Sequence, residues 1–74
     1  MSELPRITAR QIISVIVRYG FVCVRQSGSH KIYKNPQGKL TTVPFHAGKI
    51  LHLKVLKNIL KDADITIEQL QAML

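Results

Sequence analysis

Residues 21–43 read FVCVRQSGSHKIYKNPQGKLTTV, and two turn signals divide this stretch into three short runs. Small residues form the first signal, at 27–29. The second, at 35–38, has proline and glycine where type I and type II turns favour them. Apolar, β-branched and aromatic residues fill the runs and favour strands. Two successive hairpins predict an antiparallel meander. Its strands are predicted at about residues 21–25, 30–34 and 39–43.

An amphipathic helix is predicted before the meander, at about residues 9–19. Thr8 and Gln11 match a capping box, in which each side chain accepts a hydrogen bond from the other residue's backbone amide. Apolar residues follow at helical spacing, and Gly20 suits the left-handed position that ends a helix. These apolar residues are Ile12, Ile13, Ile16 and Val17.

A second amphipathic helix is predicted after the meander, at about residues 51–62, and a capping box at Thr66 and Gln69 begins a short terminal helix. The apolar stripe of the second helix is Leu53, Leu56, Ile59, Leu60 and Ala63. The order α-β-β-β-α predicts an α+β fold, a two-layer sandwich with helices on one face of a three-stranded antiparallel sheet. We expect residues 1–74 to form a single domain.

Positive charge is the clearest functional signal in the composition. Eleven lysines and arginines face four acidic residues, which gives a net charge of +7, and all eleven lie between Glu3 and Asp62. Such a field attracts polyanions and speeds their encounter with the protein. The charge favours a nucleic acid as the partner. Solubility and complementarity to an acidic protein are the alternatives.

The cysteine content and the hydropathy pattern argue against a secreted, disulfide-bonded protein and against a membrane protein. Cys23 is the single cysteine, and because it lies between Val22 and Val24 we expect a buried core thiol. A free cysteine without a bridge fits a reducing cytoplasm. No apolar run approaches the ~20 residues that span a bilayer, so no membrane association is expected. The first residues, 1–5, lack the apolar segment of a signal peptide.

His30 is the residue best suited to chemistry. Histidine reaches both protonation states near neutral pH, and RNA cleavage needs a base for the 2′-hydroxyl proton or an acid for the leaving 5′-oxygen. Arg25, Lys31 and Lys34 are close in sequence and can stabilise charge on a phosphate. Ser29 can contribute a hydroxyl or simply permit the turn. The alternative is that His30 is an ordinary strand-end residue.

Strand alternation raises a question about access to His30. Because side chains alternate between the two faces, His30 shares a face with Ile32, and Lys31 shares the other with Tyr33. If Ile32 points into the helix-covered core, His30 reaches solvent only at the end of the sheet or through a bulge.

The other candidates for RNA contact have structural alternatives. Tyr33 can stack on a base or pack across the strands. His46 follows a strand-to-helix junction, where it can line the same groove as His30 or serve as a loop residue. Lys54 and Lys57, with Lys61, lie on one helix stripe, which can follow phosphates or face solvent.

Metal and other cofactors are not expected. A site built from His30, His46 and His52 is conceivable, but these spacings match no compact metal-ligand pattern and the chain has no cysteine pair.

The chain resembles the HicA (YcfA-like) toxins through an ordered set of short motifs that runs from about Arg10 to the C-terminus. The motifs are Gly20-Phe21, VRQSGSH at 24–30, Tyr33, Pro36-Gln37-Gly38, Thr42-Val43-Pro44, His46 and the helical segment 56–63. Two positions depart from the family pattern. Leu53-Lys54 stands where the family commonly has a Pro-Gly or similar pair, and Asp64 stands where it usually has glycine.

The resemblance implies a fold like that of the double-stranded-RNA-binding domain. It also implies an endoribonuclease, an mRNA interferase toxin of a type II toxin–antitoxin module that depends on His30 and needs no metal. The implied partners are mRNA and a cognate HicB-type antitoxin that blocks the toxin. A non-catalytic RNA-binding module of the same fold is the alternative. With His30 as the catalytic residue, the expected RNA contacts are Arg25, Ser29, Lys31, Tyr33, Lys34, His46, Lys54 and Lys57.

Overall fold

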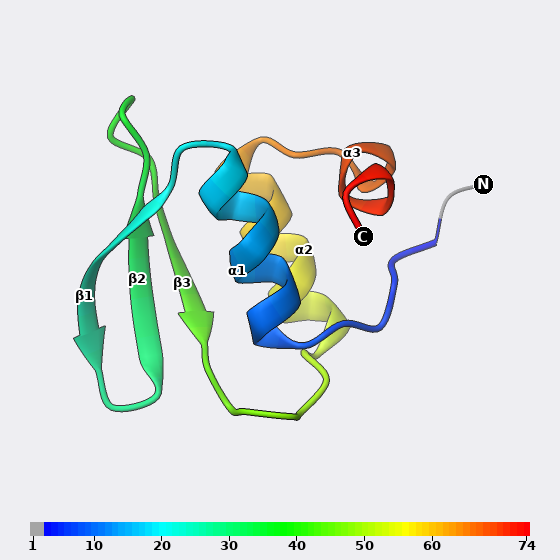
Figure 1. Ribbon diagram of the computed structural model, residues 1–74, viewed down its shortest axis with the longest axis horizontal. Coiled ribbons are helices and arrows are strands. Elements are labelled where there is room, and N and C mark those ends of the chain that lie inside the picture. Colours follow the sequence, from blue (N-terminus) through cyan, green and yellow to red (C-terminus); the bar gives the residue numbers. More distant parts are fainter. Residues whose placement is uncertain (1–2) are drawn as a thin grey trace.

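The computed structural model describes residues 3–74, which form three strands between an N-terminal helix and two C-terminal helices (Figure 1). The elements are α1 (Ala9–Arg18), β1 (Val22–Ser27), β2 (His30–Lys34), β3 (Leu40–Pro44), α2 (Leu53–Ala63) and α3 (Ile67–Ala72). The predicted α+β architecture with an antiparallel sheet is confirmed. Predicted and observed bounds of the strands and the first two helices agree closely, because turn and cap chemistry acts over only a few residues.

The central strand of the sheet is β2, and the strand order is β1-β2-β3. Every residue of β2 has a partner on β3, from His30 opposite Pro44 to Lys34 opposite Leu40. The ladder between β1 and β2 contains a β-bulge, because the register shifts between Cys23 and Arg25. The bulge marks an irregular outer edge strand on an otherwise regular sheet.

Burial identifies which face of the sheet the helices cover. Tyr33 is only 5% exposed, and Thr41 and Val43 on the same face of β3 are buried as well. Ile32 therefore points to the opposite, open face, together with His30. The apolar side that packs under the helices is the Tyr33 side.

The core lies between this covered face and the helices. Both predicted capping boxes are present, and in the first the Gln11 amide donates to the Thr8 hydroxyl at 3.3 Å while the Thr8 amide donates to Gln11 Oε1 at 2.9 Å. The largest fully buried side chains are Phe21, Ile12, Ile16, Leu56, Ile59, Leu70 and Val43. The apolar stripes of α1 and α2 supply most of them, as the helical spacing predicts. Val17 was expected in the stripe of α1 but is 49% exposed, and Val15 is buried in its place.

The sheet extends past the helical layer. The helices pack mainly against β3, and Figure 1 shows β1 on the far side of the sheet from them. All six residues of β1 are exposed. The prediction that Cys23 is a buried core thiol is therefore wrong, because this edge strand lies beyond the cover of the helices. The Cys23 thiol donates to the Arg25 carbonyl oxygen at 3.5 Å across the bulge.

Unusual residues begin and end α2. His52 is its N-cap, and the Nδ1 atom of His52 accepts a hydrogen bond from the Lys54 amide at 3.1 Å. At the other end Asp64 adopts the left-handed conformation, with φ of 58°, and its amide donates to the carbonyl oxygens of Leu60 and Lys61. Asp64 thus takes the conformation for which glycine is usual at a helix end.

Within residues 3–74, none of the helices combines the length and the apolar character that a membrane span requires.

Candidate nucleic-acid interface

A tight hairpin turn positions His30 as the first residue of β2. Ser27 pairs with His30, which leaves Gly28 and Ser29 as a two-residue turn. Gly28 has a positive φ of 58°, in the position where type II′ hairpin turns place glycine. The Ser29 carbonyl oxygen accepts a hydrogen bond from the Phe45 amide at 2.6 Å, so the turn is tied to the chain that leaves β3.

His30 is exposed on the open face of the sheet. Its ladder neighbours are Ser27 on β1 and Pro44 on β3. Because this face has no helix over it, the imidazole reaches solvent without any opening motion. Strand alternation had left open whether His30 faces the helices or solvent. Because Tyr33 is the residue that faces the helices, Ile32 and His30 lie on the open side of the sheet.

The register of the hairpin brings Arg25 to the same face as His30. Arg25 pairs with Ile32, which makes Arg25 a diagonal neighbour of His30 across the ladder. Diagonal neighbours have Cα atoms about 7–8 Å apart, within reach of a long side chain. A three-residue turn at 27–29 would instead pair Gln26 with His30 and turn Arg25 toward the covered face.

Lys34 shares the open face but lies at the opposite end of β2 from His30. The separation along the strand is roughly 13 Å at the usual rise per residue. Lys34 is exposed, so it is free to contact a phosphate other than the one nearest to His30. On the open face, Arg25 lies near His30 at the turn end of the hairpin, and Lys34 lies at the opposite end of β2.

The structure contradicts base stacking by Tyr33. Its ring lies on the covered face, with Cys23 and Thr41 as ladder partners, so neither side of the ring is open to a base. Burial raises the pKa of the Tyr33 phenol above its ordinary value of 10.0, and the neighbouring Cys23 thiol adds to the effect. The alternative role, packing across the strands, is the one observed.

Lys31 does not flank His30, because adjacent residues of a strand point to opposite faces. Its side chain is partly buried, and its Nζ atom lies 4.3 Å from the centroid of the Phe45 ring, a cation–π contact. The expected cluster of Lys31 with His30 is therefore not formed on the open face.

Ser29 and His46 lie at the same end of the sheet as His30. Ser29 is partly exposed in the turn, and its backbone carbonyl is what holds Phe45. His46 is exposed after β3 and lines a pocket of about 190 Å³. Pro44 lines that pocket too and is the ladder partner of His30, so it connects the two histidine regions.

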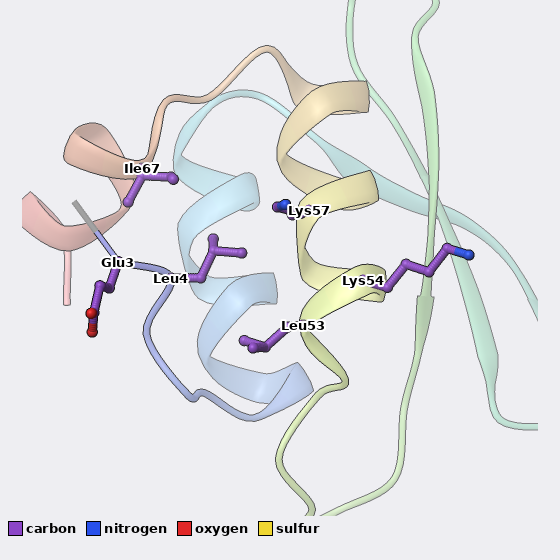
Figure 2. Close-up of a pocket in the computed structure, with 6 residues that line it drawn as sticks. All are labelled: Glu3, Leu4, Leu53, Lys54, Lys57 and Ile67. Carbon is purple, nitrogen blue, oxygen red and sulfur yellow. The ribbon is translucent and has the colours of Figure 1, made fainter. Parts of the chain in front are cut away.

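Lys54 and Lys57 belong to a different surface. They line a groove of about 620 Å³ together with Glu3, Leu4, Leu53 and Ile67, shown in Figure 2. All six residues come from the N-terminal segment, α2 and α3. The RNA contacts expected from the sequence are thus divided between the open sheet face and this groove.

Two roles escaped the sequence analysis. His52 is a helix cap rather than a free histidine, a role that its place before the second helix indicates only once the helix start is known. Ser27 is the cross-strand neighbour of His30, which depends on the length of the turn. Across residues 3–74, no group of three or more His, Cys, Asp or Glu side chains is arranged to hold a metal ion.

The fold and its open, basic sheet face define a class of small α+β proteins with a solvent-exposed histidine on a sheet. A family model described as the HicA toxin of bacterial toxin–antitoxin systems matches residues 9–65. The match covers most of the chain and includes the sheet, α1 and α2. The chain belongs to the HicA toxin family. A comparison with curated proteins finds no match.

Proposed function

We propose that this protein is an endoribonuclease toxin, an mRNA interferase, with His30 as its catalytic residue. The observation that carries the proposal is the exposed position of His30 on the open sheet face, with Arg25 as its diagonal neighbour. Membership of a toxin family supports it. Residues 1–74 then act as one catalytic domain in the cytoplasm, restrained by a cognate HicB-type antitoxin.

The chemistry is a transesterification within the RNA strand. As a general base, His30 takes the proton of the 2′-hydroxyl, whose oxygen attacks the adjacent phosphorus. The bond from phosphorus to the 5′-oxygen then breaks, which leaves a 2′,3′-cyclic phosphate and, after protonation of the 5′-oxygen, a 5′-hydroxyl end. As a general acid, His30 instead supplies that last proton. Either role is worth roughly a hundred- to ten-thousand-fold in rate.

The neighbouring cations hold the RNA backbone. The Arg25 guanidinium presents planar donors that match a phosphate, and it stabilises the charge that develops as the phosphorus is attacked. Lys34 holds a second phosphate further along β2, and His46 and Ser29 bound the site at the turn end. Since the nucleophile is the 2′-oxygen of the substrate, the step requires no metal-bound water.

Substitution of His30 tests the proposal. The His30→Ala protein should cleave a fluorescent RNA oligonucleotide at least about a hundredfold more slowly than the wild type, in the presence of a chelator. Its thermal unfolding temperature should be nearly unchanged, because the side chain is exposed. Gln37→Ala, an exposed change in the other hairpin turn, is the control and should cleave at the wild-type rate.

The products provide an independent check of the mechanism. Cleaved fragments should end in 2′,3′-cyclic phosphate, and a 2′-deoxy nucleotide at the cleaved position should block the reaction. Wild-type cleavage by His30→Ala would refute the catalytic role. RNA that the wild type binds but leaves intact would instead favour the non-catalytic RNA-binding module.

A further inference from the structure

We propose that the groove between α2, α3 and the N-terminal segment binds a short acidic amphipathic helix of a partner protein. The proposal goes beyond RNA cleavage and does not depend on His30. The groove has a volume of about 620 Å³, which is within the range typical of ligand-binding pockets in proteins. Its lining residues, in Figure 2, are Glu3, Leu4, Leu53, Lys54, Lys57 and Ile67.

Apolar side chains from three separate segments form the floor of the groove. Leu4, Leu53 and Ile67 reach into the same space from the N-terminal segment, α2 and α3 (Figure 2). All three are only partly buried, and Leu4 and Ile67 pack at the margin of the core. Covering such side chains with apolar groups of a partner removes their surface from water, which is favourable. Phosphate and ribose gain little from such a floor, which argues against RNA as the occupant.

The walls of the groove are held in place before any partner binds. The Gln71 side chain donates from Nε2 to the Glu3 carbonyl oxygen at 2.8 Å, which fastens the N-terminal segment to α3. The Leu51 amide donates to the Ile7 carbonyl oxygen at 2.8 Å, which fastens the same segment to the chain that enters α2. A preformed groove lowers the ordering cost of binding.

The charge at the rim selects an acidic partner. Lys54 and Lys57 lie three residues apart on α2, and both are exposed. Glu3 adds one carboxylate to the lining, so the two lysines leave the rim with a net positive charge. The Lys54 side chain extends away from the apolar floor, which leaves Lys57 as the cation nearer to it (Figure 2). Carboxylates placed beside the apolar residues of an amphipathic helix match this arrangement, and such helices bind grooves through side chains at i, i+3, i+4 and i+7. A second copy of this +7 chain would bring like charges together.

The groove is formed partly by residues outside the segment that matches the HicA family model. Glu3, Leu4 and Ile67 lie outside the matched residues 9–65, whereas the α2 residues lie inside them. Half of the lining therefore comes from segments beyond the matched part. We expect this surface to select the cognate partner.

A binding experiment on the full chain tests the proposal. The probe is a fluorescein-labelled helical peptide of about 14 residues, four turns, with leucine on one face and glutamate beside it. The control peptide has the same composition in scrambled order. Fluorescence anisotropy should show the amphipathic peptide binding at least about tenfold more tightly than the scrambled one.

Variants then locate the site. Leu53→Asp and Lys57→Glu should each weaken binding of the amphipathic peptide by about tenfold or more. Lys61→Glu makes the same charge change one turn further along α2, outside the groove, and should alter binding by less than about twofold. Ile67→Gln, on α3, provides a second apolar change if Leu53→Asp does not fold. The His30→Ala protein should bind the peptide as tightly as the wild type.

Three results would overturn the proposal. Equal binding of both peptides, or equal losses in Lys57→Glu and Lys61→Glu, would mean that the peptide follows net charge alone. Loss of RNA binding in Leu53→Asp as large as in Lys57→Glu would assign the groove to RNA. A dimer in sedimentation analysis that Leu53→Asp abolishes would identify a second copy of the chain as the occupant.

Discussion

The β1–β2 hairpin and the helical layer differ sharply in what surrounds their side chains. In α1 and α2 the buried residues recur on one face of each helix, and together they make up about half of the core. In β1 all six residues are exposed, and on β2 only Tyr33 is buried. The core of this small chain lies under the helices, mainly against β3, which leaves β1 and the open face of β2 free to present side chains to solvent.

This division separates the residues that stabilise the protein from those proposed to act on RNA. His30 and Arg25 need no partner in the core. Pairing with β2 positions Arg25, and pairing with β1 and β3 positions His30. Their side chains can therefore be changed at little cost to the fold. The comparison predicts that substitutions in the two regions have different consequences.

The largest expected effect on stability is in the helical layer. Leu56 is completely buried, so Leu56→Ala should lower the free energy of unfolding by about 2–5 kcal/mol. Val22 on β1 is 59% exposed, so Val22→Ala should cost less than about 1 kcal/mol. Urea unfolding followed by circular dichroism measures both. Similar losses in the two proteins would show that the hairpin is as tightly packed as the helices.

An intermediate effect is expected from moving one arginine between the faces of β1. Arg25→Ala should weaken RNA binding by about tenfold or more, since a hydrogen bond to a charged group is worth about 1.5–3 kcal/mol. The double variant Arg25→Ala with Gln26→Arg keeps the net charge of the chain but places the guanidinium beside Lys31, on the other face.

That charge-matched control decides between position and charge. Filter binding at fixed salt should show the double variant to be as weak as Arg25→Ala. Wild-type RNA affinity in the double variant would mean that binding depends only on the total charge of the hairpin. The two faces of β1 would then be equivalent for RNA binding.

The smallest effect concerns Tyr33, the buried residue of β2. Its pKa is raised by burial, so the folded state resists ionisation of the phenol. The resulting stabilisation is complete below pH 10 and is lost as pH rises through the raised pKa of the folded state. Tyr33→Phe should therefore lose less stability than the wild type as the pH rises above 10.0, measured by urea unfolding.

The Tyr19→Phe protein is the matched control for this measurement. Tyr19 is 38% exposed, and its removal leaves Tyr33 as the single tyrosine, whose ionisation is then followed by ultraviolet absorbance. A midpoint at or below pH 10.0 would contradict the burial of the ring.

Much of the fold could be predicted because its signals are local. The capping boxes at Thr8 and Thr66 use hydrogen bonds between residues three apart, and they place helix starts within the sequence itself. The turns depend on glycine and proline at particular positions. Helical periodicity likewise identified Leu56 and Ile59 before their burial was known.

The faces of the strands were harder to predict. Ile32 and Tyr33 are both apolar, so alternation alone allowed either one to face the helices. The exposure of Cys23, between two valines, was missed for a related reason. Its local sequence suits a core, but its burial depends on how far the helices extend across the sheet.

The amino-acid order alone was enough to establish the elements, their sequence along the chain, the strong positive charge and the family resemblance, because each rests on residues close together in the chain. Three-dimensional packing was needed to place Arg25 beside His30, to turn Lys31 and Tyr33 away from it, and to assign Lys54 and Lys57 to a separate groove. These outcomes depend on strand register and on where helices rest against the sheet. Both are set by contacts between segments that are distant in sequence.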